Sequence, residues 1–155
     1  MRKLFGALIA ISVMAMPAFG EDAKQTTGIQ HVVVKGLKKP VEPYNHATIY
    51  NGIVYLSGVE AFKPGTLELA SDKPKGQAQQ VLKNLKTILE ATGSDMDHIL
   101  KLNIYVSNMA NFPAINEAID EAIPANPPAR TSCAVSGVPM NALVIMDAVA
   151  AVKKK

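Results

Sequence analysis

The chain has 155 residues and one cysteine, and its 16 Lys and Arg residues against 13 Asp and Glu residues give a formal net charge of +3. A chain of this size can bury the core of a single domain without the support of disulfides or bound metals. The lone Cys133 excludes an intrachain disulfide and a metal site that needs a pair of cysteines. The small charge argues against a nucleic-acid surface, because phosphate binding requires clustered cations.

Residues 1–20 have the pattern of a cleavable secretory signal. Two cations precede an apolar run at residues 4–19, and the small residues Ala18 and Gly20 stand before a cut ahead of Glu21. The alternative is a membrane anchor, but the run is short for a bilayer. Cleavage would leave 14 cations against 13 acids, and it predicts a periplasmic or secreted protein without membrane attachment.

The remainder of the chain is expected to form one domain. The polar residues 21–28 indicate a flexible leader, a single domain follows over residues 29–152, and the chain closes with a basic tail at 153–155. The chain shows no internal repeat and no low-complexity tract, so one domain is expected.

The first part of the domain is rich in β-branched residues. They predict strands at residues 29–35, 47–50 and 53–59. Asn51 and Gly52 separate the last two runs, and because both tolerate a positive φ they predict a tight hairpin.

Two amphipathic helices are predicted. Apolar residues recur at three- and four-residue steps over 76–93, where Gly93 is the expected end. The second helix is expected to begin at Asn111 as the N-cap, with Pro113 in its first turn, and to end at the loop 124–128.

Three further strands are predicted at residues 99–106, 129–136 and 143–152. Over 99–106 the alternation places Leu100 on the buried face with the other apolar residues. The order βββαβαββ predicts an α+β fold with both helices on one face of the sheet. The other face also carries apolar residues, so we expect other subunits to cover it.

Arg130 and Asn116 are candidate binding residues. Arg130 opens a strand directly after two prolines, and its guanidinium can bind a carboxylate through two parallel hydrogen bonds. A surface ion pair is the alternative interpretation. Asn116 falls on the apolar stripe of the second helix, where it is either a satisfied core amide or a residue that faces a ligand.

Tyr44, Ser57 and Gly58 are further candidates: Tyr44 precedes the predicted hairpin, and Ser57 and Gly58 stand at its end. Tyr44 can donate a phenol hydroxyl into a cleft, or it can be an ordinary amphipathic tyrosine. Ser57 and Gly58 offer a hydroxyl and an accessible backbone amide. No base lies beside the serine in the sequence, so a hydrolase triad is not supported.

Asp147 is the one charged residue on a strand face that it shares with Leu143, Ile145 and Val149. A carboxylate in such a place pairs with another group or has a raised pKa. Asp147 is therefore a possible acid of the site.

The remaining reactive side chains do not form a metal site. The three histidines are scattered, and Asp95, Asp97 and His98 lie in a turn where they are expected to cap a helix or strand. Cys133, in the middle of a strand, is expected to be a small buried residue. No metal and no cofactor are predicted.

Several of these residues occur together in motifs that resemble the RidA (YjgF) family. The motifs are Pro43-Tyr44-Asn45-His46-Ala47, Leu56-Ser57-Gly58, Asn116, Pro128-Ala129-Arg130-Thr131, Gly137-Val138-Pro139 and Asp147-Ala148-Val149-Ala150. The similarity extends over about residues 29–152. It implies a chorismate-mutase-like fold, a homotrimer with clefts between subunits, and hydrolysis of small enamines and imines such as 2-aminoacrylate to 2-keto acids and ammonia.

The resemblance also implies roles for individual residues. Arg130 would bind the substrate carboxylate, and Tyr44 and Asn116 would line and order the cleft. Ser57, with the backbone of Gly58, would hold substrate or water. Ser132 occupies the position of a family cysteine and would lie in the binding site.

Ile145 is the main departure from the family pattern. Active members carry a glutamate there that is thought to position the attacking water, and an isoleucine cannot order water or move a proton. Asp147 lies ~6–7 Å further along the same face. We therefore expect an enamine/imine deaminase or, as Ile145 favours, a non-catalytic protein that binds a small keto acid or amino acid. Ribonuclease activity is a third hypothesis, which the near-neutral charge disfavours.

Overall fold

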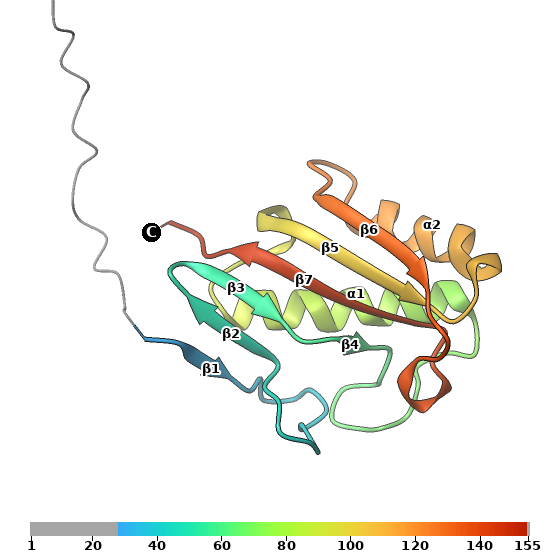
Figure 1. Cartoon of the computed structure of the whole chain (residues 1–155), viewed down its shortest axis with the longest axis horizontal. Helices are drawn as coiled ribbons and strands as arrows, with labels where there is room; N and C mark the ends of the chain where they lie inside the picture. Colours follow the sequence, from blue (N-terminus) through green and yellow to red (C-terminus); the bar gives the residue numbers. More distant parts are fainter. Residues whose placement is uncertain (1–27, 155) are drawn as a thin grey trace, which may run out of the picture.

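The computed structural model describes residues 28–154 (Figure 1). The predicted signal at 1–20 and residues 21–27 of the predicted leader lie outside the described residues. The strands are β1 (Gln30–Val32), β2 (Ala47–Tyr50), β3 (Ile53–Leu56), β4 (Val59–Glu60), β5 (Ile99–Val106), β6 (Ala129–Ala134) and β7 (Val144–Ala151). They form one seven-stranded sheet in the order β1-β2-β3-β7-β5-β6, in which β4 also pairs with β7.

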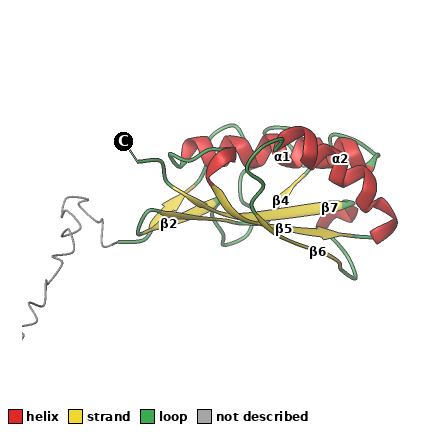
Figure 2. Ribbon diagram, turned by 90° about the horizontal axis from the view of Figure 1, so that it is seen from above, coloured by secondary structure: helices red, strands yellow, loops and turns green. Residues whose placement is uncertain are grey.

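Both helices cover the same face of this sheet, as predicted (Figure 2). They are α1 (Pro74–Ala91) and α2 (Phe112–Ala122), with 3-10 turns at Met96–His98, Met109–Asn111 and Pro139–Asn141. The α1 residues Leu85, Ile88 and Leu89 are buried against the sheet. The only parallel pair in the described sheet joins β5 to β6, because α2 carries the chain back across the face between them.

The predicted strand at 53–59 is interrupted. β3 and β4 both pair with β7, but Ser57 and Gly58 lie between them outside either strand. The Ser57 N–H still donates to the carbonyl oxygen of His46 at 3.0 Å. The interruption therefore turns the chain while it keeps a backbone hydrogen bond, and it exposes Gly58 at the surface.

The prediction that Leu100 is buried was wrong. The register between β5 and β7 shifts between Ile99 and Lys101, and Leu100 is 50% exposed. An extra residue in one strand reverses the alternation locally, so Ile99 and Leu102 are buried on either side of the bulge.

The helix ends agree only in part with the prediction. Gly93 has a φ of 78° and follows the last turn of α1, which confirms it as the stop. Asn111, however, makes no side-chain capping bond. Asn108 accepts from the Ala110 N–H at 2.9 Å instead, because a 3-10 turn precedes α2.

The face of the sheet away from the helices is uncovered in the single chain, and we call it the open face. It carries Tyr55, Tyr105, Ile145, Asp147 and Val149. These residues alternate along their strands with buried residues, and the pairing between the strands places them on one face. The edge strand β6 is mostly exposed, and the prediction that Cys133 is buried was wrong for the chain by itself. Within residues 28–154, no helix is long and apolar enough to span a bilayer.

Candidate active site

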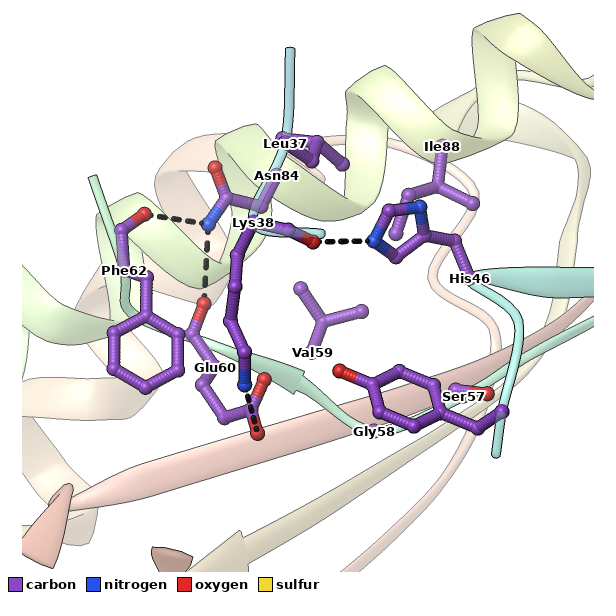
Figure 3. A pocket seen from close by; sticks show the side chains of 11 residues that line it. Leu37, Lys38, His46, Ser57, Gly58, Val59, Glu60, Phe62, Asn84 and Ile88 are labelled. Carbon is purple, nitrogen blue, oxygen red and sulfur yellow. Dashed lines mark hydrogen bonds and ion pairs between the residues drawn. The ribbon is translucent and has the colours of Figure 1, made fainter. Parts of the chain in front are cut away.

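Three of the predicted site residues lie around one small cavity beside β4. Tyr44, Ser57 and Gly58 line it together with Lys38 and Glu60. Figure 3 shows the side chains of Lys38 and Glu60 approaching one another within this lining. The cavity has a volume of about 30 Å³, which is room for about one water molecule. We call this cavity and its lining the β4 pocket.

The hydroxyl of Ser57 is oriented by the backbone beside it. Its Oγ donates to the carbonyl oxygen of Asn45 at 2.6 Å. Because the partner is a carbonyl and not a base, Ser57 is not arranged as a nucleophile. Because its proton is engaged, the hydroxyl oxygen can interact with a further group only as an acceptor.

His46 is buried at the back of the β4 pocket, and both of its ring nitrogens are occupied. The Val34 N–H donates to Nδ1 at 2.8 Å, so the proton resides on Nε2, which donates to the carbonyl oxygen of Lys38 at 2.9 Å (Figure 3). These two bonds hold the segment between Val34 and Lys38 against the sheet. His46 is therefore a structural residue.

Lys38 and Glu60 were not identified from the sequence. Their Nζ and Oε1 atoms are 3.8 Å apart, each side chain is only 15% exposed, and the Lys38 Nζ lies 4.6 Å from the centroid of the Phe62 ring. The Asn84 amide holds the backbone on this side, donating to the carbonyl oxygens of Glu60 and Phe62 at 3.1 and 2.9 Å. One sequence signal was present: Glu60 is an acid that directly follows the apolar run predicted as a strand over residues 53–59.

Ile145 packs directly against this region. In the antiparallel pair of β4 with β7, Glu60 lies opposite Ile145, which places both side chains on the open face. A Cβ atom built on Gly58 would lie 2.8 Å from the Ile145 Cδ1 atom. Gly58 therefore provides the space that the Ile145 side chain fills.

Arg130 and Asn116 also come together, but elsewhere. The Arg130 Nη1 donates to the Asn116 Oδ1 at 2.7 Å, and the Asn116 Nδ2 donates to the Asp120 Oδ2 at 2.9 Å. The Arg130 guanidinium carbon lies 5.8 Å from the centroid of the Phe112 ring. Asn116 is half-exposed, so the core-amide interpretation was wrong, and the residue fixes the direction of Arg130.

We call this second group, with Ser132, the arginine edge. Ser132 lies two residues along β6 on the same side as Arg130, because they pair with the buried residues Ile104 and Leu102 of β5. A cavity of about 320 Å³ adjoins Arg130, between α2 and the Pro127-Pro128 segment. Its volume suits a small carboxylate, and Asp120 lines it as well.

Asp147 belongs to neither group. The Asn103 Nδ2 donates to its Oδ1 at 2.7 Å across the open face, so Asp147 is paired. Burial is the main cause that raises the pKa of the Tyr105 phenol above its usual value, and the nearby Asp147 carboxylate raises it further. Asp147 thus forms part of a polar row on the open face, two residues away from Ile145 along β7.

The two groups cannot meet within one chain. From β4 to β6 the sheet order crosses β7 and β5, which is three strand spacings, or about 14 Å. Arg130 also points to the helix side, whereas Ile145 and Glu60 lie on the open face. The predicted site residues are therefore divided between the β4 pocket and the arginine edge.

The turn at Asp95 caps a helix, as predicted. The Asp95 Oδ1 accepts from the Asp97 N–H at 3.1 Å and lies 2.6 Å from the His98 Nδ1. This hydrogen bond is the main reason that the pKa of Asp95 lies below its usual value. Within residues 28–154, no three His, Cys, Asp or Glu side chains are grouped as metal ligands.

The sequence and the fold both match known proteins. The model of the family described as Endoribonuclease L-PSP matches residues 36–152. Reactive Intermediate Deaminase A, chloroplastic, of Arabidopsis thaliana is 33% identical over 136 residues, covering 86% of this chain and 73% of that protein. The 2-iminobutanoate/2-iminopropanoate deaminase of Dermatophagoides farinae is 33% identical over 115 residues, covering 74% and 90%. The crystal structure of RidA from an Antarctic Psychrobacter species has a TM-score of 0.75 at 29% identity, covering 79% of this chain and 98% of that one.

Proposed function

The chain belongs to the RidA (YjgF), or Endoribonuclease L-PSP, family, and from this premise we propose that it hydrolyses small carboxylated imines to 2-keto acids and ammonia. The substrates would be of the 2-aminoacrylate and 2-iminobutanoate type. Relatives named as deaminases of such compounds support the reaction class.

The observation that carries the proposal is the fixed direction of an exposed arginine. The guanidinium has five N–H groups, and one of them donates to Asn116. Phe112 lies against its face. A planar guanidinium held in this way binds a carboxylate in one orientation through two parallel hydrogen bonds. Such a site would orient the imine carbon that adjoins the carboxylate.

We further propose that the active site is composed of two subunits of a homotrimer. The arginine edge of one subunit would meet the β4 pocket of the next, because the two groups are about 14 Å apart in one chain. The exposed β6 edge and the uncovered open face provide surfaces for this contact. Substrate bound by Arg130 would then face Tyr44, Ser57 and Ile145 of the neighbouring subunit.

An imine-trapping assay tests the reaction. An amino-acid oxidase would generate 2-iminobutanoate from 2-aminobutanoate, and semicarbazide would report the imine that remains. We expect the protein to accelerate imine loss. Arg130→Ala should lower kcat/KM roughly 10- to 100-fold, the range for a charge-assisted hydrogen-bonded pair. Lys86→Ala is the matched control, since Lys86 is a cation on the solvent side of α1 that contacts Glu90.

Imine loss no faster than in buffer would refute the deaminase function. The second candidate, a protein that binds a small carboxylate without catalysis, is favoured by Ile145. In that case 2-ketobutyrate would raise the melting temperature of the wild type but not of Arg130→Ala. The absence of any shift with small 2-keto or amino acids would refute this candidate too.

We also propose that the protein acts outside the cytoplasm, in the periplasm or as a secreted protein. The proposal rests on the charged start, apolar run and small residues within residues 1–20. The intact mass of the protein from a fractionated culture tests it: a chain that begins at Glu21 is expected, and a full-length cytoplasmic chain would contradict it.

A further inference from the structure

We propose that Glu60 is the acid–base residue of this site, and that the β4 pocket holds the water that attacks the imine. The inference rests on the proposed deaminase function. It assigns the proton-transfer role to a residue that neither the sequence motifs nor the position of Ile145 indicated.

The β4 pocket has the size that a single water requires, and polar residues are part of its lining. Its volume of about 30 Å³ accommodates about one molecule, and a buried water needs two to four polar partners. Glu60, Ser57 and Tyr44, which each carry a polar side chain, are among the residues that line the cavity. Ser57 already donates its proton to Asn45, so Ser57 and Glu60 can both accept from a water there.

Glu60 is the one titratable group of the pocket that is suited to take a proton. The titratable side chains of the lining are Lys38, Tyr44, His46 and Glu60. His46 uses both ring nitrogens in hydrogen bonds to the backbone. Lys38 is a cation with no acceptor, and a phenol is a weak base near neutral pH. The carboxylate of Glu60 remains.

The position of Glu60 relative to Ile145 strengthens the assignment. The two residues are directly opposite in the β4–β7 register, so their Cβ atoms lie about 5 Å apart on the same face. A carboxylate at position 145 would therefore lie beside Glu60, next to Gly58. The acid that position 145 lacks is present at position 60, on the paired strand β4.

Lys38 is the positioning residue for this carboxylate. Its Nζ is 3.8 Å from the Glu60 Oε1, and both side chains are largely buried. Lys38 is itself held at two points: its ammonium group lies over the Phe62 ring, and its backbone carbonyl oxygen accepts a hydrogen bond from His46. The ion pair limits the directions that the Glu60 carboxylate can take, while its second oxygen can face the water.

Glu60 can carry each proton that moves during the hydrolysis. The water oxygen bonds to the carbon of the protonated imine, the C=N π electrons move to nitrogen, and Glu60 takes a proton from the water. Glu60 then returns this proton to the nitrogen of the carbinolamine. The C–N bond breaks with its electron pair on the leaving ammonia, and the hydroxyl proton passes to Glu60 as the keto group forms. Release of that proton to ammonia completes the hydrolysis.

Steady-state kinetics with 2-iminobutanoate test the proposal. Glu60→Gln should lower kcat roughly 100-fold or more, the range for loss of a general acid–base, with little change in KM because Arg130 still binds the carboxylate. Glu68→Gln is the matched control, since Glu68 forms a Lys–Glu pair with Lys63 in an exposed loop. The melting temperature of each variant is measured alongside.

A variant that places the carboxylate on β7 in place of β4 distinguishes a catalytic role of Glu60 from a structural one. The double variant Glu60→Gln/Ile145→Glu should recover at least tenfold in kcat over Glu60→Gln, because the carboxylate returns to the same face. If Glu60→Gln does not fold, Glu60→Asp should show a reduced kcat at an unchanged melting temperature. A kcat of Glu60→Gln within twofold of the wild type refutes the inference and leaves the deaminase function standing. A wild type without imine hydrolysis refutes both.

Discussion

Arg130 is an exposed side chain whose direction is nevertheless defined. Long cationic side chains on a surface sample many rotamers, and ordering them costs entropy. Here the amide of Asn116 binds one N–H of the guanidinium, and Asp120 in turn orients that amide. Asn116 thus acts through Arg130, and the helix α2 determines the direction of a residue on the edge strand.

Asp95 shows how one carboxylate can contribute to stability through its charge. His98 holds the pKa of Asp95 below its usual value through a hydrogen bond, and Lys153 adds a smaller favourable contribution. Since the folded-state pKa is lowered, this stabilisation is present above the unfolded-state pKa. It is lost as the pH falls through the folded-state pKa.

Asp95→Asn therefore has a pH-dependent effect on stability. The asparagine can still accept from the Asp97 N–H, so the change removes the charge while it keeps the cap. We expect the variant to be less stable at pH 7 by up to about 1 kcal/mol, as for a partly exposed ion pair, and the difference to be smaller at pH 3, because part of the stabilisation is lost below the unfolded-state pKa. Urea denaturation at both values measures this. Asp97→Asn, a neighbouring exposed carboxylate, serves as the control, and a difference that grows on acidification would contradict the prediction.

At the scale of elements, two local irregularities redirect side chains, and the first of them shapes the candidate site. The interruption at Ser57 and Gly58 separates β3 from β4, which gives Ile145 room to pack and brings the Ser57 hydroxyl to the pocket. The bulge at Leu100 turns a large apolar side chain outward at the start of β5. Irregular pairing of this kind redirects side chains without loss of the sheet.

The end of α1 depends on a glycine in the left-handed region. Gly93 has a φ of 78°, and a Cβ atom there would lie at an ordinary contact distance of 3.5 Å from the Val152 side chain. Gly93→Ala is therefore expected to cost about 1 kcal/mol through backbone conformation rather than collision. Gly137→Ala is the control, since Gly137 has open space around it and no positive φ. Urea unfolding measures both, and equal stability of the two variants would contradict the prediction.

At the scale of the whole molecule, the arrangement of the sheet separates the residues that the proposed reaction requires. Both helices cover one face, and the edge strand β6 and the open face are exposed in the single chain. A cyclic assembly would bring the arginine edge of each subunit to the β4 pocket of the next. The proposed chemistry would then depend on assembly as well as on folding.

Mixed assemblies test a site shared between two chains. Arg130→Ala and Tyr44→Ala alter different halves of the site, so each variant alone should be impaired. After the two are unfolded and refolded together, roughly one site in four should combine two intact halves. Imine hydrolysis should then exceed that of either parent, and light scattering should give the mass of a trimer.

The control for this experiment is a mixture of Arg130→Ala with Asn116→Ala. Both changes lie on the arginine edge, so no arrangement of these subunits restores an intact site. Equal activity of the two mixtures, or a monomeric mass, would contradict a composite site.

The sequence alone determined the parts of this protein that depend on near neighbours. Apolar spacing predicted both helices, the Asn51-Gly52 pair predicted the hairpin, and Gly93 was identified as a helix end. Asp95 was expected to cap a turn, and it does. Each of these signals lies within a few residues of the feature that it specifies, so no knowledge of the remaining chain was needed.

Only the tertiary structure decided which distant residues meet. The exposure of Leu100 depends on the register of β5 against β7, and the opposition of Glu60 and Ile145 depends on a pairing across more than half of the domain. Asn116 was placed on an apolar stripe by its spacing, but β6 gives it Arg130 as a partner. Periodicity along one element carries no information about strand pairing, because register is set by contacts between elements. For that reason Arg130 could be named from its motif, whereas Glu60 became visible only in the folded sheet.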